Sequence, residues 1–160
     1  RARDLVRAQL HRQGLRPGEG VMGESKLELS EKMVVAILAT LHERGVVASD
    51  LSLEELDFEN TEKNSWMFMD AIIWLEREKI IRPQHPEDEY KNYPNGLLSD
   101  RDTARRITMT SRGFALLSEN YDGDLTLGQV IRRVNETGDS YTKVGNLLGG
   151  LFGSFAKSLN

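Results

Sequence analysis

The sequence contains no cysteine, and this absence excludes several classes of protein at once. Without a thiol there is no disulfide framework, no cysteine nucleophile and no zinc-finger or iron–sulfur centre, so the cytoplasm is the expected compartment. No apolar run is long enough to cross a bilayer. The arginines near residue 1 are not followed by the apolar block of a signal peptide, and we expect no such leader.

Basic residues are fewer than acidic residues. The 160 residues carry 21 Lys and Arg against 25 Asp and Glu, a net charge of −4. This balance argues against a protein whose whole surface binds nucleic acid, although it permits a local basic patch. The charge is uneven, because residues 1–20 carry +3 whereas residues 21–83 carry −6. The chain is long enough to bury one core and to carry appendages.

The residue patterns of catalytic and metal sites are also missing. His11, His42 and His85 stand on separate segments without metal-ligand spacing. The run from Asp122 to Asp124 begins like a calcium loop, but Arg133 stands where an EF-hand needs glutamate, so we expect a turn there. No serine has a convincing base and orienting residue, and there is no phosphate-binding loop. We therefore expect no enzyme, no cofactor and no metal.

Apolar residues at helical spacing predict a core helix from Ser30 to the capping glycine Gly45. Ser52 and Glu55 have the spacing of a capping box, which predicts a short helix ending near Phe58. Further helices are expected over residues 2–13, 62–79, 111–119, 126–138 and 140–160, with a linker over 14–23.

Two short strands are expected among these helices. Ile80 and Ile81 predict a strand that Pro83 ends, and alternation over residues 106–110 predicts its partner beyond a long loop. The predicted fold is mainly α with a small β-hairpin, an α+β class. Three parts are expected: an N-terminal helix and linker over 1–26, a domain over 27–119 and a C-terminal helical extension over 120–160.

The segment Ile107-Thr-Met-Thr-Ser-Arg-Gly-Phe-Ala-Leu-Leu117 resembles the strand-to-helix join of bacterial winged helix-turn-helix regulators. In that family an apolar strand is followed by Thr, two variable residues, Gly and an apolar helix. The order of expected elements over residues 27–119 is similar to the same family. The resemblance implies a third helix that enters the DNA major groove and a wing that touches the backbone.

The third predicted helix, residues 62–79, has two unlike faces. Phe68, Ile72 and Leu75 share the face expected in the core. Three interpretations of the opposite face are open: a second core layer, a surface for a protein or a second copy, and base reading, which its carboxylate opposes. That face carries Lys63, Trp66, Met67, Asp70, Trp74 and Arg77.

The expected wing contains arginines suited to phosphate contact, but acidic residues share the loop, so a solvated mixed-charge loop is the competing interpretation. The candidate nucleic-acid residues are Lys63, Arg77, Arg101, Arg105, Arg106 and Arg112.

The C-terminal segment has glycine or alanine at nearly every fourth position beside an apolar stripe. Each interior glycine costs a helix about 1 kcal/mol relative to alanine, so this helix needs a docking partner. It is expected to pack on its own domain, to bind a partner or second copy, or to lie on a membrane; the last is disfavoured because Lys143 and Lys157 are its only cations. The candidate protein interface is Trp66, Met67, Asp70, Trp74, Gly145, Leu148, Gly149, Phe152, Gly153 and Phe155.

Together these features predict a winged-helix-like assembly or regulatory module that binds protein partners or itself. The alternative is a DNA-binding regulator that contacts phosphates through the wing arginines. No small-molecule substrate is indicated.

Overall fold

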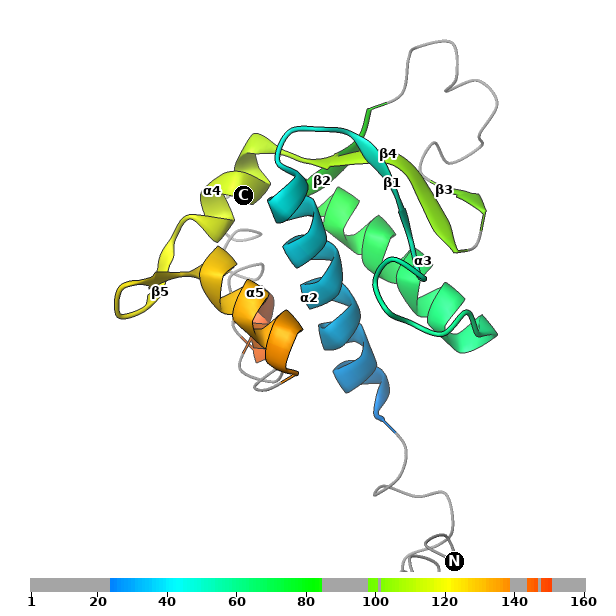
Figure 1. The fold of residues 1–160 in the computed structure, drawn as a ribbon, viewed down its shortest axis with the longest axis horizontal. Coiled ribbons are helices and arrows are strands. Elements are labelled where there is room, and N and C mark those ends of the chain that lie inside the picture. Colours follow the sequence, from blue (N-terminus) through cyan, green and yellow to red (C-terminus); the bar gives the residue numbers. More distant parts are fainter. Residues whose placement is uncertain (1–23, 85–97, 101, 139–143, 147, 151–160) are drawn as a thin grey trace, which may run out of the picture.

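The computed structural model describes residues 24–84, 98–100, 102–138, 144–146 and 148–150. An α+β fold with a small antiparallel sheet is confirmed (Figure 1). Residues 144–146 and 148–150 are helical as well. The labelled elements are α2 (Lys26–Arg44), β1 (Ser49–Ser52), α3 (Glu62–Arg77), β2 (Ile81–Pro83), β3 (Leu98–Asp100), β4 (Thr103–Met109), α4 (Ser111–Leu117), β5 (Asn120–Asp122), β6 (Leu125–Thr126) and α5 (Leu127–Thr137).

Helix α2 begins one turn earlier than the apolar pattern predicts. Ser25 is its N-cap, and the Ser25 and Glu28 side chains each accept a hydrogen bond from the other residue's backbone N–H. Residues 26–28 of this first turn are exposed, so its start is marked by the capping residues and not by a buried apolar stripe. The predicted end is confirmed, because Gly45 caps the helix with a φ of +66°.

The predicted short helix from Ser52 to Phe58 is wrong. The capping-box hydrogen bonds between Ser52 and Glu55 do form, at 3.2 and 3.3 Å, but they close turns and not a helix. Ser52 is held as the last residue of strand β1, which pairs with β4. Asp57 then turns the chain away with a left-handed φ of +62°, which no helix interior accommodates.

Strand β4 is the centre of the sheet. It pairs antiparallel with β1, β2 and β3, in the order β1-β4-β2 with β3 beside β4. The two predicted strands are confirmed, whereas β1 and β3 were not expected. Where β1 and β4 pair, Asp50 faces two residues, Arg105 and Arg106, so β4 carries a bulge.

Helix α2 runs through the middle of the fold, between α5 on one side and α3 on the other (Figure 1). Its Met33, Ile37 and Leu38 are fully buried. Ile131 of α5 and Val144 join the same hydrophobic cluster. The described parts of residues 27–119 and 120–160 therefore share one core.

The predicted boundaries of α5 are confirmed by a Thr126–Gln129 capping box and by Gly138 in the left-handed conformation. The turn expected at Asp122 to Asp124 is also present, between β5 and β6. The helix expected over 2–13, its linker and most of the last helix lie outside the described residues, as do residues 85–97 of the long loop expected over 83–105. The described part of that loop contains β3 and the start of β4, so the predicted strand begins earlier than residue 106. No helix in the described part of the chain is long and apolar enough to cross a membrane.

Candidate functional site

The outward face of α3 carries both tryptophans of the chain. Phe68, Ile72 and Leu75 are fully buried, as the helical spacing predicts. On the opposite face Trp66 is 49% exposed and Trp74 is 36% exposed, so neither indole is buried in a second core layer. Lys63, Asp70 and Arg77 are exposed on the same stripe, and Met67 is half-buried beside it.

A cavity of about 370 Å³ opens beside Trp74, between α2, α3 and residues 144–149. It brings together two segments that the sequence separates by some seventy positions, because α3 and the glycine-containing helix both pack along α2. Six of the predicted interface residues line it: Met67, Asp70, Trp74, Gly145, Leu148 and Gly149. The walls that α2 contributes, Leu27, Ser30, Glu31 and Val34, were not predicted as site residues.

The remaining predicted interface residues lie elsewhere. Trp66 belongs to the same stripe of α3 but does not line the cavity. Phe152, Gly153 and Phe155 lie outside the described residues.

Residues 144–146 and 148–150 lie against α2. Val144 is fully buried and Leu148 is only 3% exposed. Gly145 lies so close to the Glu31 side chain that a Cβ at position 145 would overlap its carboxyl end. Part of the C-terminal segment therefore docks on its own domain, while Gly149 faces the open cavity.

Two carboxylates, Glu31 and Asp70, line this otherwise largely apolar cavity, and no basic residue is among the described residues of its wall. The Glu31 side chain is buried, with no hydrogen bond or ion pair to any other described residue. Burial raises the pKa of Glu31 above its ordinary value, and the nearby Glu28 carboxylate adds to the rise. The site therefore favours a ligand that brings apolar groups and positive charge together.

The candidate nucleic-acid residues are dispersed over several elements. Lys63 and Arg77 lie near opposite ends of α3, and Arg112 is half-buried on α4. Arg105 and Arg106 are exposed and adjacent at the β4 bulge. Arg101 lies outside the described residues.

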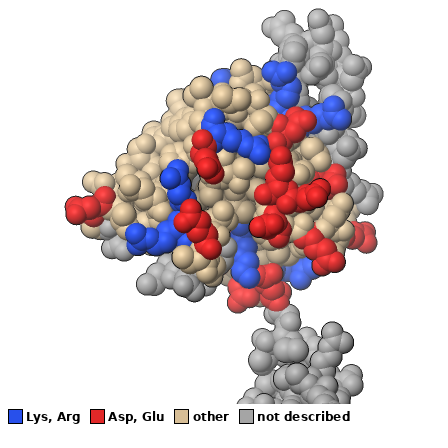
Figure 2. Space-filling view, in the orientation of Figure 1, with Lys and Arg blue, Asp and Glu red and all other residues tan. Residues whose placement is uncertain are grey.

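The arginine pair is accompanied by acidic groups and is partly engaged. The Arg106 backbone N–H donates to Asp50 Oδ1 at 2.9 Å, and its Nε–H donates to the Gln84 carbonyl at 3.1 Å. Figure 2 shows acidic side chains gathered over the connection between β1 and α3, with basic side chains beside them. Five acidic residues are exposed there: Glu54, Glu55, Asp57, Glu59 and Glu62.

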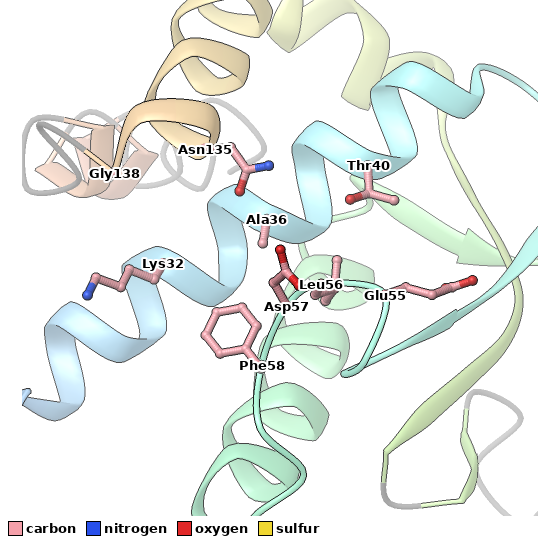
Figure 3. Close-up of a pocket in the computed structure, with 9 residues that line it drawn as sticks. All are labelled: Lys32, Ala36, Thr40, Glu55, Leu56, Asp57, Phe58, Asn135 and Gly138. Carbon is pink, nitrogen blue, oxygen red and sulfur yellow. The ribbon is translucent and has the colours of Figure 1, made fainter.

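A second cavity, of about 360 Å³, has mixed polar and apolar walls and lies between α2, the β1–α3 connection and the end of α5. In Figure 3, Asn135 and Asp57 approach Ala36 from two sides, while Glu55 points away from them. Glu55 pairs with Arg44 at 3.2 Å, and Lys32 pairs with Glu24.

The one described histidine, His42, is a packing residue. Its ring lies 6.1 Å from that of Phe114 and beneath Gly128 of α5, where a Cβ would approach it to 2.7 Å. Burial lowers the pKa of His42, and the Arg132 charge lowers it further. Within the described ranges, no group of three or more histidine, aspartate or glutamate residues is arranged to hold a metal ion.

No protein-family model, curated protein or solved structure matches this chain. The two exposed indoles and the cavity between α2, α3 and residues 144–149 are the features that set this surface apart from the rest of the described molecule. We call this surface the Trp face, defined by the exposed stripe of α3 (Lys63, Trp66, Asp70, Trp74, Arg77) and the adjoining cavity.

Proposed function

We propose that this chain is a non-enzymatic, winged-helix-like assembly or regulatory module that binds a protein partner or a second copy through the Trp face. The observation that carries the proposal is the apolar cavity beside Trp74, with exposed indoles on the same helix. Tryptophan and methionine are enriched at the centres of protein interfaces, where an anchor side chain fills a pocket.

The order of elements supports the winged-helix part of this proposal. The chain passes in order through helix α2, strand β1, a turn region, helix α3 and strands β2, β3 and β4. Strand β4 pairs with each of the other three strands. In this proposal the turns over residues 53–57 stand where the family has its second helix, α3 corresponds to the third helix, and the connection from β2 to β4 corresponds to the wing. A fold of this kind serves many functions, so the function is argued from the surface of α3.

The surface chemistry of α3 favours protein over DNA. A helix that reads bases presents Arg, Lys, Asn or Gln to base edges and phosphates, and a carboxylate on that face is repelled. Here Asp70 occupies the centre of the stripe, between the two tryptophans. The adjacent Arg105 and Arg106 favour the alternative, a DNA-binding regulator, but the exposed acidic residues near the β1–α3 connection weaken the field around them.

A cross-linking experiment tests the protein-binding function. A photo-reactive amino acid replaces Trp66 in the full chain, which is illuminated both as purified protein and in cells that produce it. We expect one defined adduct, with a second copy or with a single partner. Trp74→Ala should reduce the amount of this adduct at least tenfold, which corresponds to a loss of about 1.4 kcal/mol of binding energy. Val47→Ala is the matched control, because Val47 is 64% exposed beyond the far end of α2. Finding only diffuse adducts, or equal loss with both variants, contradicts the proposal.

A DNA titration separates the two functions. Fluorescence anisotropy of a mixed-sequence duplex is measured with the full chain at low and at near-physiological salt. Binding by wing arginines would weaken steeply with salt and would depend on Arg105 and Arg106. We expect no DNA binding that both weakens with salt and depends on Arg105 and Arg106. Binding with both properties would favour the DNA-binding regulator.

A further inference from the structure

The cavity of the Trp face lies close to the point where the described structure begins. Leu27, Ser30, Glu31 and Val34 are its α2 wall, and they occupy the first turns of the helix that Ser25 caps. Residues 1–23 precede this helix in the chain and are not among the described residues. Residues 1–23 are therefore covalently connected to the chain close to this cavity.

The charge of the cavity and the charge of that segment are opposite. The described residues of the wall include Glu31 and Asp70 and no basic residue. Residues 1–20 carry a net charge of +3, although the whole chain carries −4. Within residues 2–13 the charged side chains are three arginines, Arg3, Arg7 and Arg12, and one aspartate, Asp4.

The apolar content also matches. At helical spacing Leu5, Val6 and Leu10 fall on one side of residues 2–13, with the arginines flanking them. The cavity offers apolar walls from Val34, Met67, Ala71, Trp74 and Leu148. An amphipathic basic segment that lays its apolar side into an apolar groove with acidic residues uses helix-in-groove recognition.

The linker that joins residues 2–13 to α2 is long enough for these residues to reach the cavity. Residues 14–24 number eleven, and an extended chain spans about 3.3–3.6 Å per residue, so they reach at most about 35–40 Å. The α2 wall of the cavity, from Leu27 to Val34, extends over only about 10 Å at 1.5 Å per residue. A short tether of this kind gives the segment an effective concentration on the order of mM.

We infer that residues 2–13 of the same chain occupy the cavity of the Trp face and compete there with any protein partner. The inference rests on the proposed function in one respect, since it regulates access to the surface proposed to bind that partner. The segment would contact the cavity through Leu5, Val6 and Leu10, and its arginines would lie near Glu31 and Asp70.

The composition of the chain permits a direct test in the full-length protein. Because there is no cysteine, Ala8→Cys provides a single site for a nitroxide spin label, and the two tryptophans give only two indole N–H signals in a nitrogen-15 NMR spectrum. Trp66→Phe and Trp74→Phe assign those signals. Ala8 stands away from the apolar side of residues 2–13, so the label does not replace a docking residue.

We expect the label at position 8 to remove most of the intensity of the Trp74 indole signal, relative to the same sample with the nitroxide reduced. A label at Val47→Cys, on an exposed residue beyond the other end of α2, is the control and should leave that signal unchanged. Combining Arg3→Glu, Arg7→Glu and Arg12→Glu should restore the signal several-fold, and Leu5→Ser with Leu10→Ser should do the same by removing the apolar contact.

Other occupants give different results. Broadening that appears only when a spin-labelled chain is mixed with a nitrogen-15 chain would place a second copy in the cavity and overturn the inference. Broadening from a label at Ser158→Cys, with none from position 8, would assign the cavity to the C-terminal segment and overturn it as well. So would an unchanged Trp74 signal in every sample. Partner cross-linking at position 66 is a separate measurement, so failure of the inference and failure of the proposed function are told apart.

Discussion

The junction between α4 and β2 and the contact between residues 144–150 and α2 both depend on a glycine, but they differ in what that glycine meets. A Cβ at Gly113 would lie 2.5 Å from the backbone carbonyl oxygen of Ile80. A Cβ at Gly145 would meet the carboxyl end of the Glu31 side chain. The Ile80 carbonyl oxygen accepts a hydrogen bond from the Thr110 backbone N–H at 2.9 Å and is fixed in the backbone, whereas the end of a glutamate side chain can move aside. The first junction is therefore rigid, and the second, beside the cavity, is adjustable.

The rigid junction provides the largest expected effect. Gly113→Ala forces a methyl group against Ile80 and also to within 2.5 Å of Met109 Cγ. We expect the free energy of unfolding to fall by about 1–3 kcal/mol, the usual cost of overpacking, although alanine is the better helix former. Urea denaturation monitored by circular dichroism measures it.

A substitution of Thr110, at the same junction, is the control for Gly113→Ala. Thr110 Oγ1 donates to the Lys79 carbonyl at 2.6 Å and accepts from the Gly113 N–H at 3.0 Å, so it joins α4 to the end of α3. Thr110→Ser retains both hydrogen bonds and should cost much less than Gly113→Ala. Equal stability of Gly113→Ala and the wild type would show that the junction is not rigid.

These glycines illustrate what the sequence predicts and what it leaves open. The Thr110–Gly113 spacing was identified as a family-like pattern, and the structure supplies a steric reason for it. The ends of α5 were predicted correctly because Thr126, Gln129 and Gly138 act through neighbours in the sequence. Local signals of this kind depend on nothing distant.

Features that depend on tertiary pairing were missed. Ser52 and Glu55 make the hydrogen bonds of a capping box, yet β1 pairing with β4 and the left-handed Asp57 prevent a helix. The bulge at Arg106 depends on Asp50, which is far from it in the sequence.

About half of the residues that line the cavity were predicted, because only those residues stand out in the local sequence pattern. Met67 and Trp74 stood out because large apolar side chains lie on the polar side of an amphipathic helix. Glu31 and Val34 did not, because α2 is apolar over most of its circumference and the pattern does not say which side faces a cavity.

Two titratable groups on α2, the buried Glu31 and the half-buried His42, predict how stability depends on pH. Both favour the neutral form, so their effects have opposite signs. The pKa of Glu31 is raised, so its contribution to stability is fully present below its ordinary value of 4.5 and is lost as pH rises through the higher folded value. The pKa of His42 is lowered, so stability falls as pH drops below its ordinary value of 6.5.

Glu31→Gln isolates the first of these effects. The variant should be more stable than the wild type near neutral pH, and its advantage should shrink as pH falls toward 4.5, where the wild-type carboxyl is neutral too. Urea denaturation across this range, with the exposed Glu43→Gln as control, measures the difference. An advantage that is independent of pH would mean that burial of the Glu31 charge is not its cause.

The adjustable contact provides the smallest expected effect and the sharpest contrast with Gly113. Gly145→Ala gains the helix preference of alanine, about 1 kcal/mol, but must displace the Glu31 side chain toward the cavity. Gly149→Ala gains the same preference with nothing within 4 Å of the new methyl group. We expect Gly149→Ala to stabilise the protein by up to about 1 kcal/mol and Gly145→Ala to change its stability by less than that.

Gly145→Ala in a Glu31→Ala background is the control. There it should stabilise the protein as much as Gly149→Ala does, because the Glu31 side chain that it would displace is gone. A Gly145→Ala variant as destabilised as Gly113→Ala in both backgrounds would show instead that the contact of residues 144–150 with α2 is as rigid as the α4–β2 junction.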